Sequence, residues 1–250
     1  MNARLICIAI LAIVIISCKS QYRIVDMQGA IIQIDSTFDS SPHTKMNNLV
    51  LSYKMEHDKE MSEIIGTSVE LMDYNRPESL LTNLTSDVMK EYGDEHLPAG
   101  TVIGVMNVHG HRATMPQGSI TVGNLYEIYS FDNTITFLEL KGKDLNKIFE
   151  SYARIGGAGI SSNVKLTIED RKVKTVLVDE KPIDKNKTYN IVTLDYLAEG
   201  NDNMSAFQNA ITKQDTGITL RDVMIAWVKD QTLRGNKIVS TLDNRIVIIE

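Results

Sequence analysis

The sequence predicts an α+β fold in which helices flank a mixed β-sheet. Stretches of β-branched and apolar residues alternate along the chain with stretches whose apolar residues recur at helical spacing. Such alternation favours parallel strands joined through helices. Residues 164–168 and 173–178, however, are separated only by a short charged turn, and they predict an antiparallel hairpin. A sheet that contains both kinds of connection is mixed.

Two helices are expected in the first half of the chain. One begins near Lys45 with its apolar residues on one face, and Gly66 is its expected stop. The residues of that face are Met46, Leu49, Val50, Tyr53 and Met61. The other helix follows Pro77 and is expected to end before Gly93. Its apolar residues are Leu81, Leu84, Val88 and Tyr92.

The second half predicts strands interrupted by two further helices. The expected strands are 101–106, 134–140, 164–168, 173–178, 189–194 and 246–249, because each is rich in apolar or β-branched residues. Helices are expected at 145–152 and at 220–228 from the spacing of their apolar residues. Hydrophobic residues make up 43% of the chain and charged residues 23%, as in ordinary globular proteins. We therefore expect one domain over residues 43–250.

The N-terminus predicts export. Residues 1–17 carry one positive charge, at Arg4, followed by an apolar run from Leu5 to Ile16, as in a secretory signal. That run is shorter than the roughly 20 apolar residues that an ordinary membrane-spanning helix needs. The residues that precede Cys18 resemble the lipobox of bacterial lipoproteins.

The lipobox resemblance implies a lipoprotein signal peptide over 1–17 and a lipidated Cys18. Two acyl chains on that cysteine would anchor the protein stably to the bacterial cell envelope, on its periplasmic or surface face. The alternatives are a plain signal peptide with an incidental cysteine and a short uncleaved anchor. Residues 18–42 are polar and are expected to form a tether. Their apolar patch, which predicts one strand, is Ile31, Ile32 and Ile34.

Charge and cysteine content exclude several functions. The net charge of -6 and the lack of a basic stripe argue against binding of a nucleic-acid polymer. The two cysteines are Cys7, within the signal, and Cys18, so the mature chain is expected to lack a thiol nucleophile and a disulfide. The sequence contains neither a Gly-x-Ser-x-Gly elbow nor a phosphate-binding Gly-x-x-x-x-Gly-Lys loop.

The histidines give little support for a metal site. A two-metal phosphatase needs several Asp, His and Asn ligands around ions about 3.5–4 Å apart. Potential ligands are close in sequence only at 94–96 and at His109 and His111. Two histidines two positions apart in a strand could chelate a metal, but no third ligand lies near them in sequence. We expect a loop with two solvated histidines instead, and neither a metal nor another cofactor in this chain.

Polar loops follow the predicted strands and helices, and such loops often carry ligand sites. These loops include 107–112, 130–133, 156–159 and 195–203. In order along the chain they resemble the C-terminal domain of bacterial and animal 5'-nucleotidases. The family's Asn-x-Gly-Gly-x-Arg loop is matched by 107–112, which read Asn-Val-His-Gly-His-Arg. The other matching segments are 118–121, 130–133, 140–145 and 196–203. The helix after Pro77 and the segment 221–246 are similar too. The resemblance covers about residues 43–249.

The resemblance implies that this domain holds the nucleoside part of a nucleotide. In the family, two aromatic rings sandwich the base, an acid takes the ribose hydroxyls, and Asn and Arg side chains hold the phosphate side. By motif position the implied nucleotide-binding residues are Phe131 and Tyr196 as the rings, Asp202 as the ribose acceptor, and Asn107, Arg112 and Arg76 on the polar side. The alternative for each of the two rings is ordinary core packing.

Several positions depart from the family pattern. His109 replaces the first of the paired glycines, and Tyr196 stands where Phe is usual. Asn201 and Asn203 replace two glycines of the last loop, but Asn accepts left-handed backbone angles better than most residues. Arg76 lies one position away from the family's arginine before its opening helix.

The ligand motifs of the family's metallophosphatase domain do not occur as a set in this sequence. The family hydrolyses phosphoric monoesters, but this chain alone is expected to lack the dimetal site. We expect the recognition half of a 5'-nucleotidase, for a nucleotide or nucleoside, acting with a separate metallophosphatase chain that carries the divalent metals. The alternatives are a free-standing nucleotide or nucleoside receptor and a structural surface lipoprotein that has lost the pocket.

Overall fold

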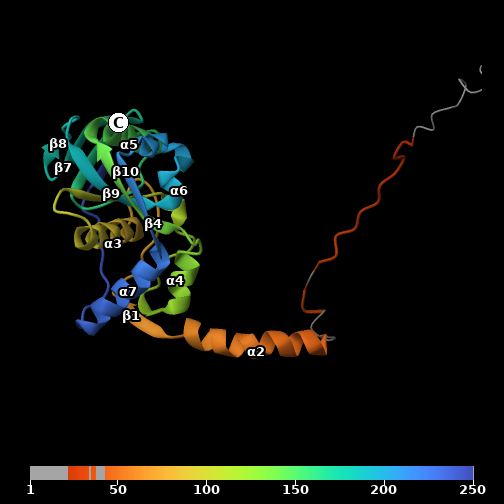
Figure 1. Cartoon of the computed structure of the whole chain (residues 1–250). Helices are drawn as coiled ribbons and strands as arrows, with labels where there is room; N and C mark the ends of the chain where they lie inside the picture. Colours follow the sequence, from red (N-terminus) through yellow and green to blue (C-terminus); the bar gives the residue numbers. More distant parts are fainter. Residues whose placement is uncertain (1–21, 34, 38–42, 250) are drawn as a thin grey trace, which may run out of the picture. The chain divides into compact units, whose positions relative to one another are not determined.

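The computed structural model describes residues 22–33, 35–37 and 43–249 (Figure 1). Its contacts divide the chain into two compact units, with the boundary after Leu49. In the first unit, residues 22–33 form neither helix nor strand, so the strand expected at Ile31 and Ile32 is absent. Both side chains are exposed, and no strand within the described ranges pairs with their backbone. The signal segment, Cys18 and Ile34 lie outside the described residues.

Helix α2 (Thr44–Met61) confirms the helix predicted from Lys45, although none of its side chains is buried. It ends at Met61, and Gly66 is therefore not its stop. Gly66 lies instead in strand β1 (Ile64–Ser68), against helix α7 (Leu220–Leu233). A Cβ atom at Gly66 would lie 2.6 Å from Cγ1 of Val228, so the absence of a side chain permits this close approach.

The main sheet of the second unit has five strands in the order β10-β4-β9-β2-β5. Its strands are β2 (Val102–Met106), β4 (Thr134–Lys141), β5 (Gly159–Ile160), β9 (Thr188–Leu194) and β10 (Thr212–Thr219). Strands β2 and β9 are parallel, and the other neighbours are antiparallel. The sheet is therefore mixed, as predicted. Strand β10, a polar strand at the sheet's edge, was not predicted.

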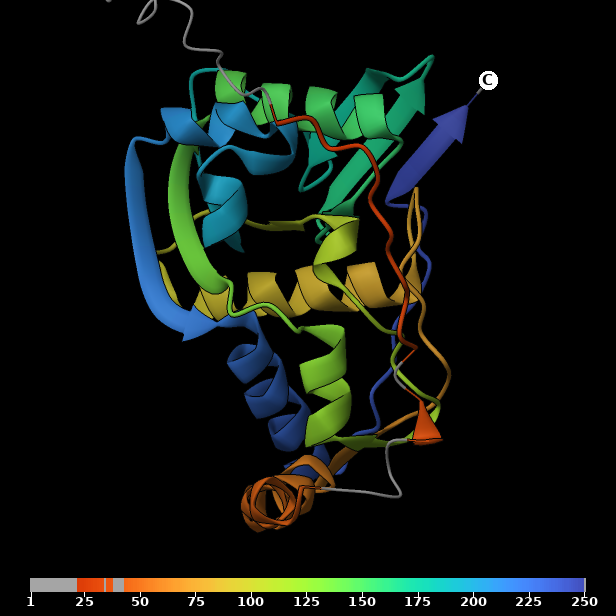
Figure 2. The ribbon, with the colours of Figure 1, turned by 90° about the vertical axis from the view of Figure 1, so that its right-hand side faces the viewer.

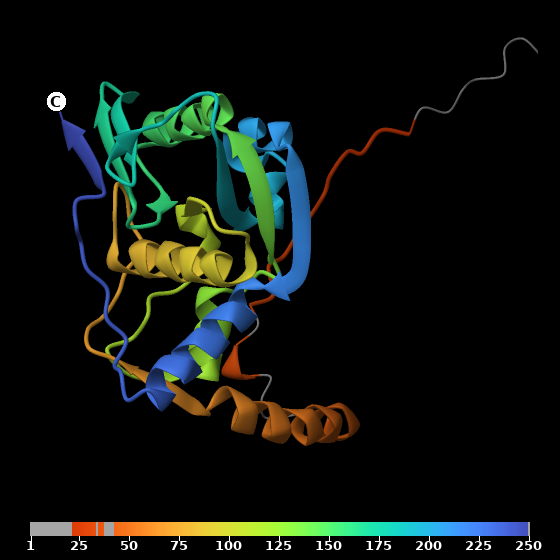
Figure 3. The ribbon, with the colours of Figure 1, turned by 60° about the vertical axis from the view of Figure 1, so that its left-hand side comes forward.

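Two smaller sheets complete the strand structure. The predicted hairpin is confirmed as β6 (Val164–Glu169) and β7 (Lys172–Val178), in a four-stranded sheet with order β11-β6-β7-β8. The outer strands are β8 (Lys181–Pro182) and β11 (Ile246–Ile249), and β11 runs parallel to β6 near the C-terminus (Figure 3). Strand β1 pairs antiparallel with β3 (Gly118–Thr121).

Helix α3 (Leu80–His96) packs against β2 and β9. It begins with a capping box, in which Ser79 and Thr82 accept each other's backbone N–H. It was predicted to end before Gly93 but continues to His96. A Cβ at Gly93 would lie 2.4 Å from Cγ2 of Val192, so this glycine brings the helix close to the sheet and does not end it.

The remaining helices are α4 (Val122–Ile128), α5 (Gly142–Ile155) and the short α6 (Asp195–Ala198). The predicted apolar face of α5 is confirmed, because Leu145, Ile148, Phe149 and Tyr152 are fully buried. Helix α7 packs against α3, α4 and β1, on the side of α3 away from α5 (Figure 2). Among the described residues, no helix combines the length and apolarity needed to cross a membrane.

Candidate functional site

Sheet topology brings three polar loops together. Strand β9 runs parallel to β2, so the ends of both strands, at Met106 and Leu194, lie at the same edge of the sheet. Strand β4 is antiparallel to β9, with Ile135 opposite Leu194, so the loop before β4 meets the same edge. The loops at 107–112, 130–133 and 195–203 are therefore neighbours in space, although almost 100 positions separate the first from the last.

These loops form a cleft of about 300 Å³. Its lining residues are Asn107, His109, Gly110, Phe131, Asn133, Tyr196 and Asp202. The cleft thus contains four of the predicted site residues, and it adds His109, Gly110 and Asn133. All three additions lie within the motifs that carried the family resemblance, which was the signal that could have identified them.

Asp202 is held by two side chains at this cleft. Asn107 donates from Nδ2 to its Oδ2 at 2.7 Å, and the Tyr196 hydroxyl donates to its Oδ1 at 3.0 Å. The backbone at Asp202 is left-handed, with φ of 54°, as it is at Asn203, with φ of 64°. The left-handed angle expected for the asparagines of this loop is therefore found at Asn203 but not at Asn201. The hydrogen bond to the Asp202 carboxylate, with its negative charge, raises the pKa of Tyr196.

Both predicted rings are partly open to solvent. Phe131 is 47% exposed and Tyr196 is 40% exposed, which excludes the core-packing alternative for both residues. The guanidinium of Arg112 lies 5.6 Å from the centre of the Phe131 ring, a cation–π distance. Arg112 contacts the Phe131 ring but is not itself a lining residue of the cleft.

Arg76 contacts the cleft residue His109 but lies outside the cleft itself. Its Nε donates to the carbonyl oxygen of Gly157 at 2.9 Å, and its Nη1 lies 3.3 Å from Nε2 of His109. Gly157 has a left-handed φ of 101°, and a Cβ there would lie 2.5 Å from the carbonyl oxygen of Pro77. A glycine is thus needed to hold Arg76 in this place. Arg76 does not itself line the cleft.

His111 contradicts the expectation of two solvated histidines, because it is only 1% exposed. Residues 108–110 form a 3₁₀ turn rather than a strand, so His109 reaches the cleft while His111 points into the protein. Its Nε2 lies 2.9 Å from Oγ1 of Thr85 on α3, and its Nδ1 lies 3.1 Å from the carbonyl oxygen of Val108. Burial lowers the pKa of His111 to about 4. The neutral ring therefore joins the 107–112 loop to α3.

The two histidines do not converge on a common point. Across 22–33, 35–37 and 43–249, no group of three or more His, Cys, Asp or Glu side chains could hold a metal ion. What the cleft offers is two ring faces, one carboxylate and amide groups, which suits recognition of a planar ligand that carries hydroxyls.

Comparison with known proteins gives consistent results. The family model for the 5'-nucleotidase, C-terminal domain, matches residues 60–209. Protein UshA of Yersinia enterocolitica is 27% identical over 135 residues, which are 52% of this chain and 24% of that protein. The trifunctional nucleotide phosphoesterase protein YfkN of Bacillus subtilis is 25% identical over 237 residues, which are 87% of this chain and 16% of that protein.

A solved structure agrees with these matches. The 5'-nucleotidase precursor from Thermus thermophilus superimposes with a TM-score of 0.71 at 26% identity, over 83% of this chain and 43% of that chain. This chain therefore spans only 16% to 43% of the length of these relatives. The region that matches the family model covers most of the second unit, including every loop of the cleft. The chain belongs to the family of 5'-nucleotidase C-terminal domains.

Proposed function

We propose that the cleft binds the nucleoside part of a nucleotide, and that the chain is the recognition half of a 5'-nucleotidase. The observation that carries this proposal is the placement of Phe131 and Tyr196. Two half-exposed aromatic rings line one cleft, although 65 positions (196 minus 131) separate them in the sequence. An exposed ring loses contact with water when a base stacks on it, and such stacking is worth about 1–3 kcal/mol per base.

Asp202 is the proposed acceptor for the ribose hydroxyls. An ionised carboxylate offers about four lone-pair sites. Asn107 and Tyr196 take one site on each oxygen, which leaves the others free for a ligand. Because both protein bonds fix the carboxylate beforehand, two adjacent hydroxyls would meet an acceptor that is already oriented.

The phosphate side of the ligand is assigned to Asn107, Arg112 and Arg76. Arg76 is fixed near the cleft by Gly157 and contacts the cleft residue His109, so its guanidinium is available beside the wall of the site. Arg112 lies on Phe131 and would have to leave that ring to contact a phosphate in the cleft. A guanidinium binds phosphate oxygens with two parallel hydrogen bonds, which suits either residue to this role.

Phosphate hydrolysis is assigned to a partner. The matched relatives carry this region as a minor part of much longer chains, and one of them, YfkN, is a trifunctional nucleotide phosphoesterase protein. We infer that a separate metallophosphatase chain supplies the divalent metals, while this chain presents the nucleotide. Lipidation at Cys18 would hold this chain on the cell envelope, beside such a partner. The alternative is a free-standing nucleotide-binding or structural surface lipoprotein without a hydrolytic role.

Calorimetric titration with adenosine and 2'-deoxyadenosine tests the proposed site. Asp202→Asn keeps the size of the side chain but removes its charge. It should weaken adenosine binding by about 13- to 150-fold, the effect of losing a charged hydrogen bond of about 1.5–3 kcal/mol. The loss should be smaller for 2'-deoxyadenosine, which offers one hydroxyl fewer. The control is Asp132→Asn, because Asp132 is an exposed acid beside Phe131 that does not line the cleft. Equal losses for the two nucleosides would refute the role of Asp202, and no binding by the parent chain would leave the structural alternative.

A further inference from the structure

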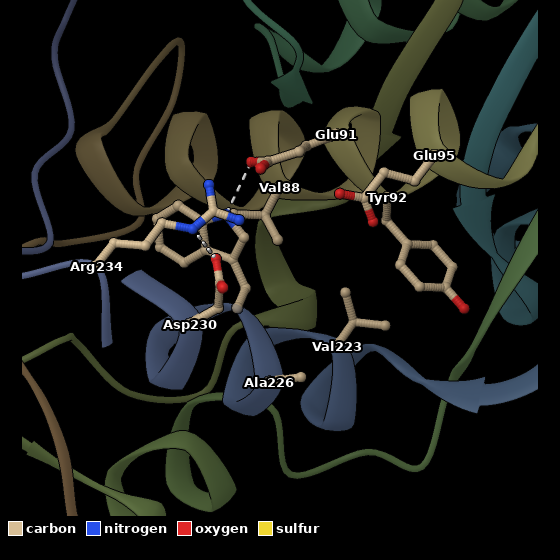
Figure 4. Close-up of a pocket in the computed structure, with 9 residues that line it drawn as sticks. Val88, Glu91, Tyr92, Glu95, Val223, Ala226, Asp230 and Arg234 are labelled. Carbon is tan, nitrogen blue, oxygen red and sulfur yellow. Dashed lines mark hydrogen bonds and ion pairs between the residues drawn. The ribbon is translucent and has the colours of Figure 1, made fainter. Parts of the chain in front are cut away.

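A second concave surface lies in the same unit, between α3 and α7 (Figure 4). This α3–α7 groove has a volume of about 290 Å³ and shares no lining residue with the nucleotide cleft. Val88 of α3 and Val223 of α7 point into it, and both are buried at its base. The groove therefore has an apolar floor that could cover the aliphatic part of a side chain.

Two aromatic side chains line the groove, Tyr92 from α3 and Trp227 from α7. Trp227 is a lining residue, and its Nε1 donates to Oε2 of Glu91 at 2.8 Å, so a bond between the two helices fixes the indole ring. Tyr92 lines the groove as well, and its ring stacks on His96 with 4.1 Å between the ring centres. The faces of aromatic rings attract positive charge. Because these rings are already held in place, binding a cation to them costs less conformational entropy than binding it to mobile rings would.

The rim of the groove is acidic. Glu91, Glu95 and Asp230 contribute three carboxylates, and Arg234 contributes one positive charge, an excess of two negative charges. Asp230 already accepts from Nε of Arg234 at 2.9 Å, so the chain's own guanidinium occupies one carboxylate. Glu95 has neither a hydrogen-bond nor an ion-pair partner within the part of the chain that the structure describes. The acidic rim, the apolar floor and the two aromatic rings are complementary to a cation with an apolar stem.

We propose that the α3–α7 groove binds an arginine side chain from a peptide segment of a partner protein. A guanidinium stacks on aromatic rings and forks onto a carboxylate, whereas an ammonium group acts as a point charge. The methylenes of arginine match the valines of the floor. The net charge of -6 on this chain attracts a basic partner from a distance. This proposal does not depend on nucleotide binding in the other cleft.

Trp227 makes the test direct, because it is the only tryptophan of the chain. The full chain is titrated at low salt with an acetylated and amidated Gly-Arg-Arg-Gly peptide while tryptophan emission is recorded. A matched peptide carries citrulline, which has nearly the same shape but no charge, in place of both arginines. We expect a saturable change in emission with the arginine peptide and none over the same range with the citrulline peptide. The same response to both peptides, or no saturable response to either, would overturn the proposal.

Charge variants locate the binding. Glu91→Gln retains an oxygen that can accept from Trp227, and Glu95→Gln alters a side chain without a partner among the described residues. Each should weaken the arginine peptide by about two- to fivefold, the usual range for exposed ion pairs, and the double variant should weaken it further. Asp94→Asn is the matched control, because Asp94 lies on the same helix, binds Lys90 and does not line the groove. Unchanged affinity in the double variant, or an equal loss in Asp94→Asn, would show that the peptide binds elsewhere. If spermidine binds as tightly as the peptide, the ligand of the groove is a small polycation and the proposed peptide segment is wrong.

Discussion

Replacing Phe131 by alanine removes one wall of the nucleotide cleft. If Phe131 stacks on a base, its loss should weaken nucleoside binding by about 1–3 kcal/mol, or roughly 5- to 150-fold in Kd. If it were a core residue, its loss would instead destabilise the fold. The two roles can therefore be separated by measuring affinity and stability on the same protein.

The structure sets the expected stability change. Truncation of a fully buried Phe costs about 3–5 kcal/mol. Phe131 is 47% exposed, so about half of that surface is buried, and its contact with Arg112 is worth about 0.5–1 kcal/mol at an exposed site. We expect Phe131→Ala to lower the free energy of unfolding by about 2–3.5 kcal/mol, the sum of half the burial cost and the lost Arg112 contact. Phe149 is fully buried, and Phe149→Ala should lower it by about 3–5 kcal/mol.

The assay pairs urea unfolding, followed by circular dichroism, with calorimetric titration of adenosine. Linear extrapolation gives the free energy of unfolding for the parent, Phe131→Ala and Phe149→Ala proteins. The expected pattern for Phe131→Ala is a smaller loss of stability than for Phe149→Ala, together with a roughly 5- to 150-fold loss of affinity. A stability loss as large as that of Phe149→Ala, or an unchanged Kd for adenosine, would refute the assignment of Phe131 to the cleft.

The remaining predictions concern His111, Cys18 and phosphate release. Burial lowers the pKa of His111 from 6.5 to about 4, so the unfolded chain binds more protons than the folded chain in this range. The free energy of unfolding that the protein has above pH 6.5 should therefore fall by up to about 3 kcal/mol on acidification toward pH 4. His111→Gln should reduce that fall, as measured by urea titrations at the two pH values. An equal fall in the parent and the variant would contradict the role of His111. Cys18→Ala should abolish palmitate labelling and release the protein from membranes, and label retained on the variant would refute lipidation at Cys18. The purified chain should release no phosphate from AMP above background with Mn²⁺, Zn²⁺ or Ca²⁺, whereas release that His109→Ala or His111→Ala abolishes would make these histidines metal ligands.

The sequence predicted the elements that have a strong periodic pattern. The hairpin at 164–178 and the buried face of α5 were expected from spacing alone. Strand β10 was missed because it is a largely exposed edge strand, and its polar residues carry no alternating apolar signal. Gly66 and Gly93 were interpreted as helix stops, whereas both permit close packing of helices. A glycine serves either purpose, and only tertiary structure distinguishes them.

The candidate site, like the fold, was predicted from the sequence only in part. The resemblance to the family, by motif position, was enough to predict that Asn107, Phe131, Tyr196 and Asp202 belong to one site, and the sheet edge brings their loops together. Side-chain direction could not be predicted at the histidines, because the 3₁₀ turn breaks the alternation that a strand would impose. The position of Arg112 on Phe131 was not foreseen for a related reason: a long arginine side chain can reach several acceptors, and the sequence does not select one.

The departure from the family at Tyr196 has a consequence for Asp202. A left-handed backbone at a non-glycine residue costs on the order of 1–2 kcal/mol, and Asp202 adopts one, with φ of 54°. The Tyr196 hydroxyl and the Asn107 amide both bind its carboxylate, and together they can offset that cost. A phenylalanine at position 196 would supply the ring without the hydroxyl, leaving Asn107 as the one side-chain donor to this acid among the described residues. In the proposed complex, the tyrosine therefore combines two roles: its ring stacks on the base, and its hydroxyl fixes the acceptor of the ribose.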